Sequence, residues 1–231
     1  MAIDPDKLAG KFIVLDGPDG AGKGTQLDRL EALLTEAGVT LVRARDPGGT
    51  AIGDRIRSVL LDFPNRELDV RCELLLFMAS RAQLMAEVIE PALTAGRTVL
   101  CDRFVSATCA YQGAGGVDIK RILELAPQST AGRWPDLTLV LDVEVSEGFE
   151  RTGRRSPSQQ RDSNAAGQGT LFAGVTTDAL ESRHANYHRK VREIFLSLPD
   201  CYPAPVTIVD GRGTPDQVTA RLVEVLGRID S

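Results

Sequence analysis

Cysteines and long apolar runs are both scarce in this chain of 231 residues. Its four cysteines, Cys72, Cys101, Cys109 and Cys201, form no C-x-x-C pair and no metal-ligand spacing, so we expect free, buried thiols in a reducing cytoplasm. No apolar run approaches the roughly 20 residues of a membrane span, and the first residues, MAIDPDKLAG, lack a charged segment followed by an apolar one. The sequence therefore predicts a cytoplasmic protein without a membrane partner.

Net charge is also low, because 27 Lys and Arg residues face 32 Asp and Glu residues, a balance of −5. This charge argues against nucleic acid or a membrane surface as a partner. Any anionic ligand must then be held by local clusters of arginine. Apolar residues make up 42% and charged residues 26% of the chain, which is ordinary for a globular domain.

Short β-branched runs alternate with longer helical patterns along the chain. The expected strands are 11–16, 39–44, 98–102, 137–143 and 206–210. The expected helices are 23–37, 51–61, 70–95, about 105–127, about 146–154, 178–197 and 215–229. The strands are apolar almost throughout, which suits parallel strands covered on both faces. The alternation predicts an α/β fold with a five-stranded parallel sheet, and ligands at the carboxyl ends of its strands.

The stretch GPDGAGKGTQ at 17–26 is nearly a phosphate-binding loop of the pattern G-x-x-x-x-G-K-[ST]. An expected strand precedes it and an expected helix follows it, as such a loop requires. Its glycines allow backbone N–H groups to surround phosphate oxygens, and the start of the helix adds partial positive charge. Lys23 can then reach the β and γ phosphates. The expected ATP-binding residues of the loop are Gly17, Pro18, Asp19, Gly20, Ala21, Gly22, Lys23, Gly24 and Thr25.

Gly24 is the departure from the generic pattern, because it has no hydroxyl for a metal ion. Mg²⁺ keeps several of its waters readily, so Thr25 or water can take the vacant place. The stretch also resembles the loop of adenylate kinases, which place glycine and then threonine at the same positions. The departure therefore points toward the nucleoside-monophosphate kinases.

Over almost its whole length the sequence is similar to the thymidylate kinase family, in its bacterial subclass. Four blocks carry the resemblance: the loop, RDPGGTAIGDRIRSVLL at 45–61, LLLFMASRAQLMAEVIEPALTAGRTVLCDRF at 74–104, and SATCAYQG at 106–113. The second block has Asp46 where the family has glutamate. The resemblance implies a single P-loop kinase domain over 1–231 that transfers a phosphoryl group from ATP to dTMP, giving ADP and dTDP, in dTTP biosynthesis. It also implies Mg²⁺ as cofactor and a homodimer.

Two alternatives have sequence features that discriminate them. Another monophosphate kinase, similar to adenylate kinase or UMP/CMP kinase, would keep the loop but lack FMASR together with DRF and AYQG. A nucleotide-binding protein without enzyme activity would be expected to carry a base-recognition motif such as N-K-x-D, which the chain does not contain.

Phe77 and Arg81 are four residues apart and therefore share one face of an expected helix. Such a ring can stack on a pyrimidine, and such an arginine can donate to a carbonyl on the base edge. The resemblance implies that Arg81 reaches thymine O4. It implies further that Thr108, Tyr111 and Gln112 line the base and deoxyribose, with the Tyr111 ring occupying the space of a 2′-hydroxyl.

The chemistry of phosphoryl transfer requires positioning and charge neutralisation, and no general base, because the attacking phosphate oxygen is already ionised. Lys23 and Arg103 are the expected catalytic cations, and Asp102 is expected to orient Mg²⁺ through water. The resemblance assigns Asp19 to the sugar 3′-hydroxyl and Arg57 to the acceptor phosphate.

The polar segment at 151–177 is the expected lid, which would close over ATP and exclude water. The resemblance implies that Arg151 stacks on adenine. Some family members carry a catalytic arginine in the phosphate loop where this chain has Gly20, and others supply it from a lid motif D-R-[hydrophobic]-E. Here the matching stretch at 178–181 is DALE, without that arginine. The candidates for a relocated catalytic arginine are Arg154, Arg155 and Arg161.

Overall fold

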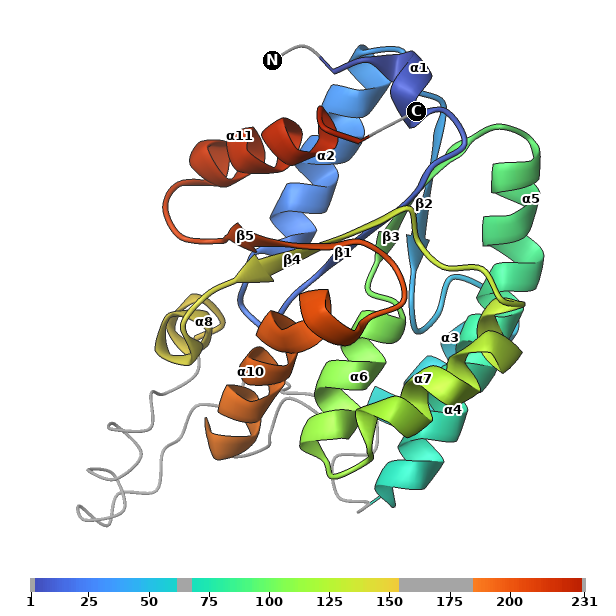
Figure 1. The fold of residues 1–231 in the computed structure, drawn as a ribbon, viewed down its shortest axis with the longest axis vertical. Coiled ribbons are helices and arrows are strands. Elements are labelled where there is room, and N and C mark those ends of the chain that lie inside the picture. Colours follow the sequence, from blue (N-terminus) through green and yellow to red (C-terminus); the bar gives the residue numbers. More distant parts are fainter. Residues whose placement is uncertain (1–2, 62–67, 154–184, 230–231) are drawn as a thin grey trace.

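The computed structural model describes residues 3–61, 68–153 and 185–229, and the description below concerns these residues (Figure 1). They form a five-stranded sheet in the order β2–β3–β1–β4–β5, and every neighbouring pair is parallel. The strands are β1 Phe12–Asp16, β2 Leu41–Arg45, β3 Thr98–Asp102, β4 Leu137–Asp142 and β5 Val206–Asp210. The predicted α/β fold is confirmed, with small differences at the strand ends.

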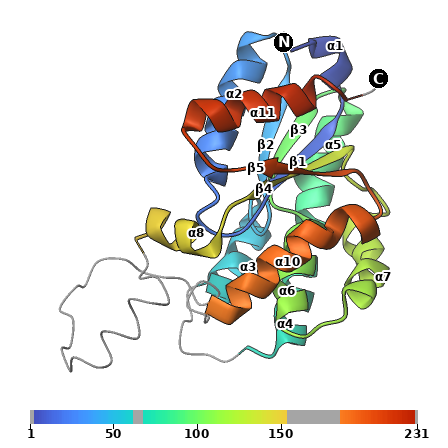
Figure 2. The ribbon, with the colours of Figure 1, turned by 60° about the vertical axis from the view of Figure 1, so that its left-hand side comes forward.

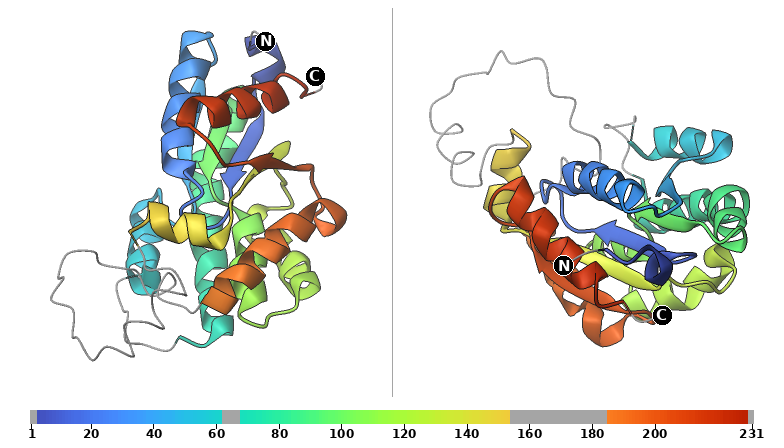
Figure 3. Two further views of the ribbon diagram at one scale, coloured as in Figure 1. Left: turned by 90° about the vertical axis from the view of Figure 1, so that its left-hand side faces the viewer. Right: turned by 90° about the horizontal axis from the view of Figure 1, so that it is seen from above.

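Helices cover both faces of the sheet. They are α1 Pro5–Leu8, α2 Lys23–Glu36, α3 Ala51–Leu61, α4 Val70–Leu84, η1 Met85–Ile89, α5 Glu90–Thr94, α6 Val105–Ala114, α7 Ile119–Thr130, α8 Val145–Arg151, α10 Ala185–Cys201 and α11 Pro215–Leu226. Figures 1 and 3 show α2 and α11 on one side of the sheet, and α6, α7 and α10 on the other. No helix in the described ranges is both long enough and apolar enough to cross a membrane.

The core consists of two apolar clusters, one on each face, and β1 contributes to both. Phe12 and Val14 belong to the cluster beneath α4, α6 and α10. Ile13 and Leu15 belong to the cluster beneath α2 and α11. Successive side chains of a strand point to opposite faces, so a strand covered on both sides must be apolar throughout. This arrangement explains the unbroken apolar run from which β1 was predicted.

The predicted helix at 105–127 is wrong as a single element. The chain forms α6, then a turn through Gly115 and Gly116, then α7. Gly116 has φ +103°, which a helix cannot contain, and the Asp118 side chain accepts from the Lys120 N–H to begin the second helix. The pattern of apolar residues continues through both helices and hides the break between them.

Two other expectations differ from the structure. The expected helix 70–95 consists of α4, the π-helical turn η1 and α5 in succession. Cys101 and Cys109 are buried as expected, but Cys72 and Cys201 are exposed. Cys72 lies in the first turn of α4, and Cys201 is the last residue of α10.

Candidate active site

The loop between β1 and α2 packs closely against neighbouring backbone. Gly17 has φ +137°, and a Cβ there would lie 2.4 Å from the Leu141 carbonyl oxygen. Gly20 has φ +77°, and its Cβ would lie 2.2 Å from the carbonyl oxygen of Gly148 in α8. Figure 2 shows α8 beside this loop. Only glycine fits at both positions. The predicted order of strand, glycine-rich loop and helix is present in the structure.

Gly24 differs from these glycines, because a Cβ built on it meets no atom within 4 Å. A serine or threonine would therefore fit there, and the glycine is not imposed by packing. The neighbouring Thr25 is exposed. Thr25 lies in the first turn of α2, and it is the residue at which the sequence predicts a metal contact.

Lys23 folds back over the loop, and its Nζ donates to the carbonyl oxygens of Gly17 and Pro18 at 2.9 Å each. Burial, together with the nearby charge of Arg103, lowers the pKa of Lys23 to about 8. The Lys23 ammonium group is thus held by two neutral carbonyl oxygens of the loop. A bound phosphate would give it a negatively charged partner.

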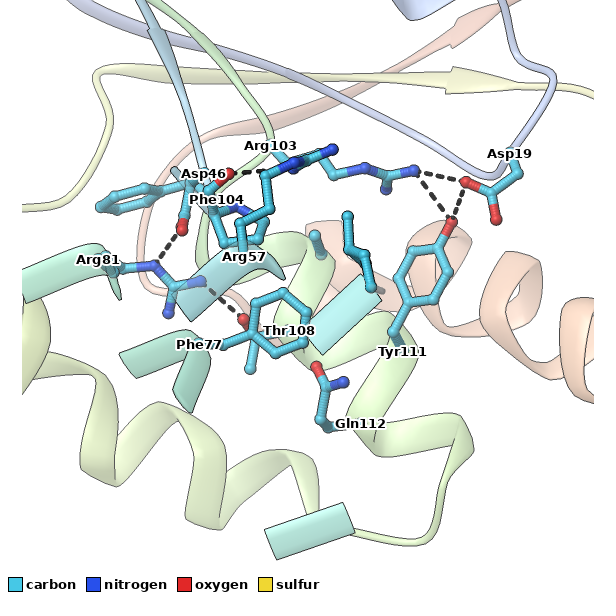
Figure 4. Close-up of a pocket in the computed structure, with 13 residues that line it drawn as sticks. Asp19, Asp46, Arg57, Phe77, Arg81, Arg103, Phe104, Thr108, Tyr111 and Gln112 are labelled. Carbon is cyan, nitrogen blue, oxygen red and sulfur yellow. Dashed lines mark hydrogen bonds and ion pairs between the residues drawn. The ribbon is translucent and has the colours of Figure 1, made fainter. Parts of the chain in front are cut away.

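Arg103 follows β3 and connects this loop to the wall of a neighbouring pocket. Its Nη1 donates to Asp16 Oδ1 at 3.2 Å and to the Gly17 carbonyl oxygen at 3.1 Å. Its Nη2 donates to Asp19 Oδ1 at 2.7 Å, and its guanidinium carbon lies 4.9 Å from the Tyr111 ring centre (Figure 4). One guanidinium group thus contacts both the phosphate loop and the pocket.

Asp19 is the acidic centre of this arrangement. The Tyr111 hydroxyl donates to Asp19 Oδ1 at 2.8 Å. Burial opposes ionisation of Asp19, but Arg103 and Lys23 overcome it and lower the pKa of Asp19. Burial raises the pKa of Tyr111 well above its usual value, so the phenol keeps its proton and donates.

Sequence reasoning missed Asp16, the last residue of β1. It is wholly buried and accepts from Ser106 Oγ at 2.6 Å, as well as from Arg103. Burial raises the pKa of Asp16, although Arg103 and Ser106 act against the rise. A charged residue at the end of an apolar strand, directly before a phosphate loop, was the available signal.

A pocket of about 530 Å³, counting the part open to solvent, lies beside this cluster. All the residues predicted to bind substrate line it, although they come from four separate stretches of the chain. They are Asp19, Arg57, Phe77, Arg81, Arg103, Thr108, Tyr111 and Gln112. Figure 4 shows these side chains converging on one space.

Arg81 is held rigidly in this pocket. It is 1% exposed, its Nε donates to Asp46 Oδ2 at 2.6 Å, and its Nη2 donates to Thr108 Oγ1 at 2.7 Å. The guanidinium carbon also lies 5.1 Å from the Phe104 ring centre. Burial raises the pKa of Asp46, although Arg81 opposes the rise. Arg81 is therefore a buried, hydrogen-bonded side chain and not a solvated surface arginine.

Gln112 lines the same pocket one helical turn after Thr108 on α6, and it is wholly buried. Its Nε2 donates to Glu73 Oε2 at 3.3 Å. Its Oε1 is buried and has no hydrogen-bond partner within the parts of the chain that the structure describes. A buried carbonyl without a donor is costly, and it lies in a pocket where a ligand could supply that donor.

Asp102 and Arg103 are adjacent but line different spaces. Asp102 lines a second pocket, beside Arg43 and Arg45 of β2, and its buried Oδ1 has no hydrogen-bond partner among the described residues. The described part of the chain contains no group of three His, Cys, Asp or Glu side chains that could hold a metal ion.

Arg57 and Arg151 complete the predicted set within the structure. Arg57 Nη1 donates to the Pro47 carbonyl oxygen at 3.0 Å, and both residues line the pocket of about 530 Å³ described above. Arg151 ends α8, where it contacts Glu147 and donates to the Gly211 carbonyl oxygen at 3.1 and 3.2 Å. It lines a further pocket of about 740 Å³ with Thr25 and other residues of the phosphate loop. The predicted arginine of the adenine side thus lies beside this loop.

The family model described as Thymidylate kinase matches residues 15–222. The chain belongs to the thymidylate kinase family. It is 41% identical over 214 residues to the thymidylate kinase of Deinococcus radiodurans, covering 92% of this chain and 94% of the relative. It is 39% identical to that of Nitratidesulfovibrio vulgaris, covering 90% and 91%. The crystal structure of thymidylate kinase from Ehrlichia chaffeensis matches with a TM-score of 0.68 and 27% identity, over 94% of this chain and 98% of that one.

Thymidylate kinase activity is the ATP-dependent phosphorylation of dTMP to dTDP, and the predicted family, enzyme class and reaction are confirmed. An adenylate- or UMP/CMP-kinase assignment and a nucleotide-binding protein without enzyme activity are both set aside. Arg154, Arg155 and Arg161 lie outside the described residues, as does most of the predicted lid at 151–177.

Proposed function

We propose that this chain transfers the γ-phosphoryl group directly from ATP on the loop 17–25 to dTMP in the pocket lined by Phe77, Arg81 and Gln112. An oxygen of the dTMP phosphate bonds to the γ-phosphorus, and the bond between that phosphorus and the β-γ bridging oxygen breaks. The products are dTDP and ADP. The observation that carries this proposal is Arg103, whose guanidinium contacts Gly17 of the phosphate loop and Asp19 at the pocket.

The polar groups of the pocket match the edge of thymine. Arginine has five N–H groups, and those of Arg81 not used by Asp46, Thr108 and Met78 can donate to O4. Gln112 Oε1 can accept from N3–H. Cytosine presents an amino donor and a ring acceptor at these two positions, so it would meet like groups at both. This complementarity supports thymine as the base.

The sugar end is formed by Asp19 and Tyr111. We assign the ionised Asp19 to the 3′-hydroxyl, and the Tyr111 ring to the space of a 2′-hydroxyl. Three cations would neutralise the phosphate charge. We assign Arg57 to the dTMP phosphate, Lys23 to the ATP phosphates, and Arg103 to the space between the two. Arg151 is assigned to the adenine side of ATP.

Mg²⁺ fits the oxygen ligands that the site offers. Asp102 has a buried carboxylate oxygen without a partner among the described residues, and Thr25 is exposed in the first turn of α2. Oxygen groups contacting through water suit this hard cation. Asp102 and Thr25 would hold Mg²⁺, which supplies charge neutralisation at the phosphate oxygens when bound.

We further propose a homodimer, formed through the outer surfaces of α3 and α4. Ile52 and Val59 of α3 are 53% and 42% exposed, and Leu75 of α4 is 63% exposed. Large apolar side chains gathered on adjacent helices mark association surfaces. The cytoplasmic location expected from the sequence stays a prediction.

The test is a coupled assay of ADP release with dTMP, dUMP, UMP, AMP, CMP and dCMP as acceptors. The expected order places dTMP first, dUMP next and the ribonucleotides well behind. Best activity with AMP or CMP would contradict the assignment of Arg81 and Gln112 to the base.

A further inference from the structure

Glu73, in the first turn of α4, is a buried acidic residue to which the reaction described above gives no role. Glu73 is only 3% exposed, and Gln112 Nε2 donates to Glu73 Oε2 at 3.3 Å. Burying a carboxylate costs free energy unless hydrogen bonds compensate it. Its placement directly behind a pocket residue therefore calls for an explanation beyond helix packing.

The side-chain amide of glutamine has two chemically opposite ends. Nε2 can only donate hydrogen bonds and Oε1 can only accept them. Because Nε2 of Gln112 donates to Glu73 Oε2, the NH₂ end of the amide faces Glu73 and the carbonyl turns away from it. Figure 4 shows the Gln112 oxygen on the side of Phe77, within the base pocket. The reverse orientation would place two acceptors, the carbonyl and the carboxylate, against each other.

Oε1 of Gln112 lacks a hydrogen-bond partner among the described residues. It is buried, it belongs to a residue that lines the pocket, and no donor in the described ranges reaches it. A ligand with an N–H at that position would satisfy it, whereas a ligand with a ring acceptor would add a second unpaired acceptor.

We propose that Glu73 is a positioning residue that fixes which end of the Gln112 amide faces the nucleobase. It thereby contributes to the choice of a base with N3–H, such as thymine or uracil, over cytosine. The inference rests on the proposed function, because it requires the base to lie between Phe77 and Gln112. It is independent of Arg81, which Asp46 holds from another element.

The decisive variant is Glu73→Gln, which keeps the size of the side chain. An amide at position 73 can offer either a donor or an acceptor, so Gln112 is free to turn its NH₂ end toward the pocket. We expect the ratio of kcat/KM for dTMP to kcat/KM for dCMP to fall by roughly tenfold, the effect of one buried hydrogen bond. Glu87→Gln, an exposed glutamate of η1, is the matched control and should leave the ratio unchanged.

A double-mutant cycle separates positioning from a merely structural role. Gln112→Leu alone should lower the same ratio, and Glu73→Gln should add nothing further when Gln112 is already leucine. If Gln112→Leu lowers the ratio but Glu73→Gln leaves it unchanged, the positioning role is overturned while the proposed function stands. If Gln112→Leu leaves the ratio of kcat/KM for dTMP to kcat/KM for dCMP unchanged, the assignment of Gln112 to the base is refuted, and with it the role of Glu73.

Folding is checked by thermal unfolding of each variant. Should Glu73→Gln not fold, Glu73→Asp replaces it, because the shorter side chain withdraws the carboxylate from Gln112. The same fall in the ratio is then expected, and an unchanged ratio would equally overturn the proposal.

Discussion

Arg81 and Asp46 form an ion pair of 2.6 Å in which each side chain is only 1% exposed. The two residues are brought together from α4 and from the segment after β2. Removing one member of a buried pair leaves an uncompensated charge, which typically costs about 3–5 kcal/mol. Breaking the pair should therefore destabilise the fold, and the intact pair holds the arginine that we assign to the base.

Asp46→Ala should lower the free energy of unfolding by about 3 kcal/mol, because Arg81 would remain buried without its partner. Urea unfolding followed by circular dichroism measures this change. The matched control is Glu224→Ala, which removes an exposed ion pair with Arg228 and should have little effect. Equal midpoints for wild type and Asp46→Ala would show that the pair does not stabilise the fold.

The sequence predicts some residues of this site but not the partners that hold them. Strand β1 was predictable because every residue from Phe12 to Leu15 is apolar, as a doubly covered strand requires. Phe77 and Arg81 were predictable from helical spacing combined with family resemblance. The hydrogen-bond partners of the pocket residues could not be predicted. Asp46 and Arg81 are 35 positions apart in the sequence, and Glu73 and Gln112 are 39 positions apart. Only tertiary packing brings such buried carboxylates to their donors.

Lys23 provides a prediction about pH. Its pKa is lowered from 10.5 to about 8 in the folded chain, so the unfolded chain binds more protons between these pH values. The free energy of unfolding of wild type, relative to Lys23→Ala, should therefore rise from pH 8 to 10.5 and stay level below pH 8. Urea unfolding of both proteins across this range measures the difference.

The same variant should remain folded and lose turnover by about a hundredfold or more, as when a donor to a developing charge is removed. Lys190→Ala, at an exposed position of α10, is the control for both measurements. Near wild-type kcat in Lys23→Ala would refute the assignment of this lysine to the transferred phosphate.

Tyr111 should decide between deoxyribose and ribose. Tyr111→Ala opens the space of the 2′-hydroxyl, so the ratio of kcat/KM for dUMP to kcat/KM for UMP should fall toward one. Tyr111→Phe keeps the ring and should keep most of that ratio. Phe77→Ala should instead raise KM for both nucleotides, because stacking does not depend on the sugar. A ratio unchanged in Tyr111→Ala would place sugar selection elsewhere in the pocket.

Association through α3 and α4 is tested with Leu75→Glu. A charge at this exposed apolar position should convert a wild-type dimer to a monomer in sedimentation velocity measurements. Leu196→Glu is the matched control, because Leu196 of α10 is also exposed, at 39%, but lies away from these two helices. Dimers persisting in Leu75→Glu would move the interface to another surface.

The last prediction concerns the arginines at 154, 155 and 161, which lie outside the described residues and rest on the sequence alone. Gly20 occupies the loop position where some thymidylate kinases carry a catalytic arginine, and Ala179 occupies the usual lid position. We therefore expect a cation from residues 154–161 to complete the charge neutralisation. The variant Arg154/Arg155/Arg161→Ala should lower kcat by roughly a thousandfold, the effect of losing an arginine finger. Affinity for dTMP should change little, since the base pocket is formed by other elements.

A matched triple variant, Arg71/Arg133/Arg228→Ala, removes the same total charge from exposed positions and should keep wild-type kcat. Single replacements at 154, 155 and 161 would then identify which arginine acts, because only one should reproduce the full loss. If the lid triple variant stays within a few-fold of wild-type kcat, the relocated arginine is refuted. Arg103 and Lys23 would then have to neutralise the transferred phosphoryl group without it.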